Sequence, residues 1–272
     1  MKRIMLAISI LVCGLQLHAQ EAIYKLEKGK AYKYLTEMTV AINQEVMGQT
    51  MNISVDGTLT NTLTVTDVLP NGNYQVNNGI ESALITVEMP QGTQTIGNDL
   101  VGKIFKSELS PSGVVVSKDT LPKDINPQNA QIMQRVYETL PDISGAKGQK
   151  LAVGTSWSVT KSDTVEARGK MIRDSKAKYT VAEVTKLNEY DCVKINYEES
   201  TESNGTMSQQ GMELTVSGSG SSKGVYYFAQ NEGIFLKGEI EQNEEQTIMV
   251  PSQGNMRIPV TQATTMKIEL VK

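Results

Sequence analysis

The chain has 272 residues, of which only three are Phe and one is Trp, and its formal net charge is −4. This acidic balance argues against nucleic acid and anionic membranes as partners. The length suits one large β domain or two of ordinary size.

Residues 1–19 have the pattern of a secretory signal peptide. Two basic residues precede an apolar run from Ile4 to Val12, and cleavage is expected after Ala19. Lipid attachment at Cys13 is disfavoured, because Val12 stands where a lipoprotein signal needs a small residue. No later stretch approaches the roughly 18 apolar residues of a membrane span. We therefore expect a periplasmic or extracellular protein with no membrane span.

Removal of this segment changes the chemical inventory. Lys2 and Arg3 leave with it, so 24 basic and 30 acidic residues remain, a net charge of −6. His18, the only histidine, is also lost, and Cys192 becomes the only cysteine. Ser-His and Cys-His catalysis and His-ligated metals are then excluded, and we expect no metal and no cofactor. We interpret Cys192 as a small buried apolar residue, with a reactive thiol as the alternative.

Residues 20–124 are predicted to form a first β unit. Apolar and polar residues alternate from Tyr32 to Ile42 and from Met51 to Val65, which is the period of antiparallel strands with one face in water. A tight turn is expected at Pro70–Asn73. Strands this long coil, so the sheet should curl into a half-barrel whose apolar face needs a cover.

Residues 125–145 are predicted to be a helix followed by a linker. The helix should run from Asn126, a good N-cap, to Leu140, with Pro127 in its first turn. Ile132, Val136 and Leu140 recur at four-residue spacing and make one apolar face. This helix is the expected cover of the curved sheet.

Residues 146–272 are predicted to form a second β unit. Ser217–Gly224 is interpreted as a flexible loop, and Pro251–Gly254 as the tip of a hairpin. The predicted fold class is thus mainly β, with two similar antiparallel meander or half-barrel units joined by one α-helix.

Three blocks recur in the same order in both units. Residues 25–32 match 150–157, residues 64–76 match 180–192, and residues 102–116 match 224–236 more loosely. This order favours an ancient duplication, and chance similarity of Thr- and Val-rich strands is the alternative.

The repeat-specific residues and two short motifs are candidate sites. Gly29, Tyr32, Gly154 and Trp157 are interpreted as packing anchors, with a ligand cleft as the alternative. Asp119-Thr120-Leu121 and Asp163-Thr164-Val165 resemble the Asp-Thr-apolar acceptor of bacterial O-glycosylation, which makes Thr120 and Thr164 possible acceptors.

Catalytic and metal-binding alternatives have little support. Glu198, Glu199 and Glu202 could supply a hydrolase carboxylate pair, but a solvated strand edge is the preferred interpretation. Two methionine pairs could bind Cu(I), although core filling explains them more simply: Met47 with Met51, and Met207 with Met212. We expect no catalytic residues and no metal ligands.

The blocks KLEKGKAY, TVTDVLPNGNYQV and GTSWSV resemble a family of uncharacterised secreted β-rich proteins of Gram-negative bacteria, a domain of unknown function. More distantly, long strands with a covering helix resemble the half-barrels of lipoprotein carriers (Lol-type). Neither resemblance carries functional residues onto this chain.

The sequence thus favours a non-enzymatic secreted or cell-envelope protein that serves as a binding or structural interaction module. The first alternative is a periplasmic carrier of a lipid-like ligand in a curved β-sheet cleft, and the second is a carboxylate hydrolase. The partner would be an unknown protein, a glycan or an apolar ligand, and neither nucleic acid nor a membrane span is expected.

Overall fold

The computed structural model describes residues 22–46, 48–120, 127–165, 169–209 and 212–271. The predicted signal segment, Met47 and the helix cap Asn126 lie outside these residues.

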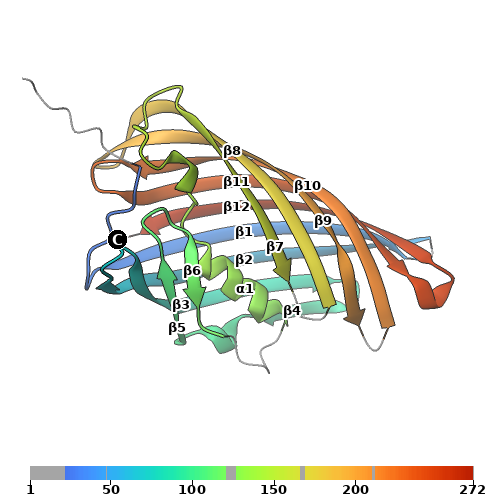
Figure 1. The fold of residues 1–272 in the computed structure, drawn as a ribbon. Helices are drawn as coiled ribbons and strands as arrows, with labels where there is room; N and C mark the ends of the chain where they lie inside the picture. The colour runs from blue at the N-terminus through green and yellow to red at the C-terminus, as the bar shows by residue number, and fades with distance from the viewer. Residues whose placement is uncertain (1–21, 47, 121–126, 166–168, 210–211, 272) are drawn as a thin grey trace, which may run out of the picture.

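The described residues form one 12-stranded sheet, in the order β6-β5-β3-β2-β1-β12-β11-β10-β9-β8-β7, with β4 paired to β3 (Figure 1). All its pairings are antiparallel. The strands are β1 (Ala31–Val46), β2 (Gln49–Val68), β3 (Tyr74–Met89), β4 (Gly92–Ile96), β5 (Ile104–Leu109), β6 (Val115–Lys118), β7 (Ser156–Val165), β8 (Gly169–Leu187), β9 (Tyr190–Gln209), β10 (Met212–Ala229), β11 (Ile234–Val250) and β12 (Met256–Val271).

The prediction of a mainly β, antiparallel protein is confirmed, but two separate units are not. The first described strand, β1, pairs with the last, β12, in a long register that runs from Lys33 opposite Val271 to Gln44 opposite Val260. The two β-rich regions therefore continue into each other through a shared seam in the middle of the sheet.

Alternation along each strand gives the sheet two distinct faces. On β1, the side chains of Tyr32, Tyr34, Thr36 and Val40 are buried on what we call the inner face, while Glu37 and the other odd-numbered residues face outward. The sheet curves around the inner face (Figure 1). Long strands coil in this way because each has a right-handed twist.

The helix α1 (Pro127–Tyr137) lies within this curve (Figure 1). Its residues Ile132, Met133, Val136 and Tyr137 share an apolar cluster with Leu59, Ile80, Ala83, Ile85, Leu100 and Phe105 of the first β region. The predicted cover is thus present, on β2, β3 and β5. The helix ends three residues before the predicted Leu140, where the Thr139 hydroxyl donates back to the Val136 carbonyl at 2.9 Å.

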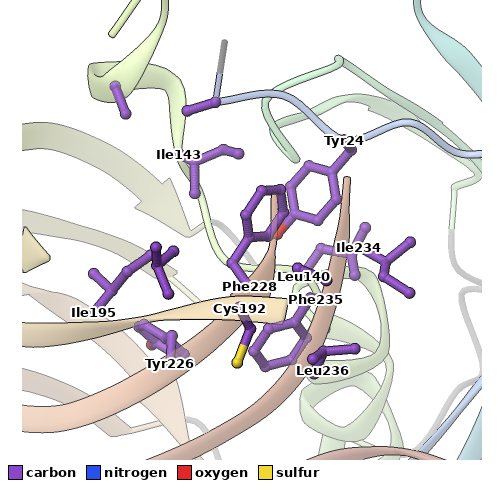
Figure 2. Packing of buried hydrophobic residues seen from close by; sticks show 14 of the residues in the cluster. Tyr24, Leu140, Ile143, Cys192, Ile195, Tyr226, Phe228, Ile234, Phe235 and Leu236 are labelled. Atoms are coloured by element: carbon purple, nitrogen blue, oxygen red, sulfur yellow. The ribbon is translucent and has the colours of Figure 1, made fainter. Parts of the chain in front are cut away.

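A second cluster closes one end of the curved sheet and draws on both β regions (Figure 2). Tyr24 packs edge-on against Phe228 with ring centroids 5.4 Å apart, and its hydroxyl donates to the Pro141 carbonyl at 2.9 Å. The Tyr34 hydroxyl donates to the Phe235 carbonyl at 3.1 Å. The segment before β1 and the segment after α1 therefore fill this end, which we call the packed end.

The predicted loop Ser217–Gly224 is wrong, because these residues lie inside β10. Their small side chains allow close approach of the neighbouring strands β9 and β11. A Cβ at Gly224 would lie 2.2 Å from the Glu239 carbonyl oxygen, and one at Gly220 would lie 2.7 Å from the Thr201 hydroxyl. The hairpin predicted around Pro251–Gly254 is confirmed, with the 3-10 helix η3 (Pro251–Gln253) at its tip between β11 and β12. Two other 3-10 helices are η1 (Asn98–Leu100) and η2 (Ser144–Ala146).

Residues matched between the two sequence blocks adopt the same backbone arrangement. Gly29, with φ 83°, donates to the Val65 carbonyl at 2.8 Å, and Gly154, with φ 89°, donates to the Val181 carbonyl at 2.9 Å. The pairing of β2 with β3 shifts register directly after Val65, and the pairing of β8 with β9 shifts directly after Val181. Both glycines occupy a left-handed conformation that favours glycine.

Candidate functional site

The inner face carries a band of apolar side chains between the packed end and the far hairpin tips. The strand register brings them together, with Met38 opposite Met266, Val40 opposite Val55, and Ile42 opposite Ile53. All but the buried Val40 keep partial exposure to solvent. We call this set the inner lane: Met38, Val40, Ile42, Ile53, Val55, Val260 and Met266.

Polar side chains line the inner face beside the lane, on β8 and β11. Arg173 of β8 reaches across two strands to Glu244 of β11, with Nη2 and Oε1 3.3 Å apart. Gln242 and Gln246 also donate to the Glu244 carboxylate, at 2.5 and 3.3 Å. Small residues between the two charged ones, such as Gly220, leave room for this reach.

Arg135 of α1 is a second inner-face guanidinium, and it contacts the inner lane. Its Nη1 lies 3.6 Å from the Met266 sulfur, and the side chain is half-buried. Burial lowers the pKa of Arg135, while the charges of Glu138, Arg173 and Glu244 act on it more weakly. Among the residues that the structure describes, none forms an ion pair with Arg135.

Aromatic side chains of β7, β8 and β9 stack on one another within the packed end. Trp157 stacks on Tyr179 with ring centroids 5.3 Å apart, and Tyr179 contacts Tyr197 at the same separation. The Tyr197 hydroxyl donates to Glu199 at 2.7 Å, and burial raises the pKa of Tyr197 well above its usual value. The void among the neighbouring core residues measures only about 10 Å³, so this end is a packed core and holds no ligand-sized space.

A hollow of about 670 Å³ lies on the opposite, outer face. Five strands line it with exposed side chains, including Glu37, Glu198, Lys223, Glu239, Glu241 and Lys267. Two ion pairs cross it, Lys223 with Glu241 at 3.0 Å and Lys267 with Glu37 at 3.7 Å. The hollow is therefore open, and its glutamates outnumber its lysines.

The three glutamates proposed as hydrolase carboxylates are not brought together. Glu199 faces inward, where it accepts a hydrogen bond from Tyr197, while Glu198 and Glu202 are exposed on the outer face. Glu198 and Glu202 are four residues apart on one strand, which corresponds to about 13 Å. This spacing exceeds that of a carboxylate pair that works on one glycosidic bond.

The other sequence candidates are dispersed. Thr120 and Thr164 are exposed, and Cys192 is buried as predicted, with burial raising the pKa of its thiol. The described residues contain no group of three or more His, Cys, Asp or Glu side chains that could hold a metal ion. Tyr32 and Trp157 both belong to the packed end.

Sequence reasoning missed Arg135, Arg173 and Glu244. The available signal was the run Gln242, Glu244 and Gln246, which places three hydrogen-bonding side chains at period two on one face of a strand. Arg135 gave no signal, because a cation beside the apolar face of a helix is usually solvated.

Comparisons with known proteins find a similar fold among solved structures. No family model matches the chain, and no curated protein gives a significant match. A solved structure described as lipid–protein interactions in lipovitellin is similar to 91% of this chain at a TM-score of 0.56 and 12% identity. This chain covers 26% of that protein, so the likeness concerns one part of a much larger molecule.

Two other solved structures align over most of the chain with low scores. An outer membrane channel from Pseudomonas putida gives a TM-score of 0.26 at 7% identity, covering 92% of this chain and 98% of the channel. A DUF1329 family protein from Desulfovibrio piger gives 0.15 at 10% identity, covering 87% and 83%. Within the described residues, no helix is long and apolar enough to cross a membrane.

Proposed function

We propose that this chain is a non-enzymatic binding protein that holds a lipid-like ligand on the inner lane. The observation that carries the proposal is an apolar band left partly exposed in the middle of the sheet. The two β regions lie edge to edge in one sheet, so neither covers this part of the other. Burying apolar surface is worth about 25 cal/mol per Å², which favours a ligand that covers the lane.

The fold supports the same class of ligand. The similar structure of lipovitellin is described by its lipid–protein interactions, and the shared part is a large curved sheet. The proposal includes export through the signal peptide at residues 1–19, which would place the protein in the periplasm or outside the cell.

Binding of the neutral fluorescent probe N-phenyl-1-naphthylamine tests the proposal. We expect the mature chain to bind the probe, and Ile53→Trp to weaken binding at least tenfold because the indole would fill the lane. The matched control is Asn52→Trp, which places the same side chain on the outer face of β2 and should bind as the wild type does.

Thermal unfolding of both variants establishes that they fold. Native mass spectrometry of the purified protein should then reveal a co-purified apolar molecule in the wild type and none in Ile53→Trp. A wild-type chain that binds no probe, or an Ile53→Trp variant that binds it fully, would contradict the proposal.

A second candidate function is a structural interaction module, which the outer hollow favours. Its carboxylates outnumber its cations, so it suits a basic protein surface. Crosslinking of the protein in cells distinguishes the two functions: a partner captured from Glu198→Cys but not from Ile53→Cys would favour the outer face.

We further propose that the two halves arose by duplication, which the equivalent backbone hydrogen bonds of Gly29 and Gly154 support.

We also propose that Thr120 and Thr164 are glycan acceptors, which the exposure of both threonines supports. Mass spectrometry of the natively expressed protein would detect hexose on peptides containing either threonine, and its loss in Thr120→Val or Thr164→Val.

A further inference from the structure

We propose that the ligand of the inner lane is an anionic amphiphile, and that Arg135 binds its carboxylate or phosphate head group while its apolar chain lies along the lane. This inference rests on the proposed function and adds the charge of the ligand and the residue that selects it.

The first step concerns the place of Arg135. Ile132 and Val136 face the sheet in a buried cluster, and Arg135 lies at the margin of that helix face. Its guanidinium contacts the sulfur of Met266, which belongs to the lane. A planar cation is therefore held directly against the apolar surface that a chain would cover.

The second step concerns the partners of the charged groups nearby. Glu244 is an inner-face carboxylate whose charge acts on Arg135, and its side chain is only 15% exposed. It is already occupied by Arg173, Gln242 and Gln246. Glu138, which directly follows α1, accepts a hydrogen bond from Gln134.

The consequence is that Arg135 has no counterion among the residues that the structure describes. Arg135 is half-buried, and its guanidinium donates to the Met266 sulfur, which is a weak acceptor. A buried or half-buried charge normally has an ionised partner, because desolvation is otherwise uncompensated. Guanidinium binds carboxylate and phosphate in a bidentate geometry, so an anionic head group is the partner that fits.

The lane gives room for the rest of such a molecule. Met266 and Val260 lie six residues apart on the inner face of β12, which corresponds to about 20 Å, the reach of a long acyl chain. The polar Thr264 and Gln262 lie between them on β12, so the apolar surface between them comes from the facing residues of β1 and β2. Met38 and Ile42 of β1 flank β12, and Ile53 of β2 lies beyond them. The head group would lie at Met266 and the chain would extend toward Val260.

Competition against the neutral naphthylamine probe tests this inference with three ligands: oleate, 1-oleoyl-lysophosphatidate and the neutral 1-monoolein. We expect both anions to displace the probe about tenfold more tightly than monoolein, as one charge-assisted hydrogen-bonded pair implies. The tighter of the two anions identifies the head group as a carboxylate or a phosphate.

Variants separate binding by Arg135 from a structural effect. Arg135→Met should reduce oleate and lysophosphatidate binding about tenfold and leave monoolein unchanged, whereas Arg135→Lys should retain most anion binding. Glu244→Gln should strengthen anion binding severalfold, because it frees Arg173 and removes a competing carboxylate. A purely structural role of Arg135 would not produce this gain.

The matched control is Lys267→Met, which removes a positive charge one residue from Met266 but on the outer face. It should bind all three ligands as the wild type does. Equal affinity for oleate and monoolein, or full anion binding by Arg135→Met, overturns the inference while the proposed function stands. Failure of the wild type to bind the neutral probe overturns both.

Discussion

Gly113 shows how single residues position the packed end. It lies in the turn between β5 and β6 with φ 84°, and a Cβ there would lie 2.6 Å from the Pro141 carbonyl oxygen and 2.7 Å from the Tyr24 ring. The same turn accepts a hydrogen bond from the Tyr24 amide at the Pro111 carbonyl, 2.7 Å away. Glycine is thus required here for close contact as well as for its backbone conformation.

We expect Gly113→Ala to destabilise the protein by about 3 kcal/mol, because it combines backbone strain with a clash in a packed core. Gly29→Ala is the matched control, since its φ is 83° and nothing lies within 4 Å of the added Cβ. It should cost only about 1 kcal/mol. Urea unfolding measures both free energies, and equal losses would contradict the proposed close contact.

Burial of Met133 against the sheet links the helix sequence to its position. Met133 is fully buried in the α1 cluster, whereas its neighbour Gln134 is exposed. We expect Met133→Ala to lower the free energy of unfolding by about 3 kcal/mol and Gln134→Ala by less than about 0.5 kcal/mol. Calorimetry checks this, and similar values for the two variants would show that α1 does not hold the sheet in solution.

The elements that the sequence predicts well are those with a local signal. The alternation in β1 and β2 and the four-residue spacing in α1 depend on neighbouring residues alone, and the structure has both. The run Ser217–Gly224 was misread because serine and glycine indicate a loop locally. In the fold they are small residues of β10 that allow β9 and β11 to approach closely.

Long-range features had no such signal. Nothing in β1 or β12 identifies the other as its partner, since the alternation of Tyr34 and Met38 suits any neighbouring strand. The site depends on the same unpredictable pairing, because Met266 joins Met38 only across that seam. The contact of Arg135 with Met266 in turn depends on where α1 docks.

At the scale of the whole molecule, one core joins both β regions. Leu63, Val65 and Leu109 of the first region belong to the same buried cluster as Trp157, Tyr179 and Ile195 of the second. Destabilising one region should therefore destabilise the other, as expected for a single cooperative unit.

Trp157, the only tryptophan, gives a direct test of this coupling. Leu109→Ala, in the first region, should lower the free energy of unfolding by about 3 kcal/mol. The free energy obtained from the Trp157 fluorescence transition, which reports on the second region, should fall by the same amount. Circular dichroism, which follows the whole sheet, should give the same midpoint. An unshifted fluorescence transition would establish two independent domains, with the boundaries predicted at 20–124 and 146–272.

The pairing of β1 with β12 also determines how late in synthesis the sheet can finish folding. During synthesis or export β1 appears first among the described strands and β12 last. The edge of β1 that pairs with β12 therefore stays unpaired until all the intervening strands have been made. Closing so long a loop is slow, and an unpaired strand edge is prone to aggregate in the interval. We therefore expect refolding to be slow and its yield to fall with protein concentration, and a holding chaperone that shields β1 would raise the yield without changing the final stability.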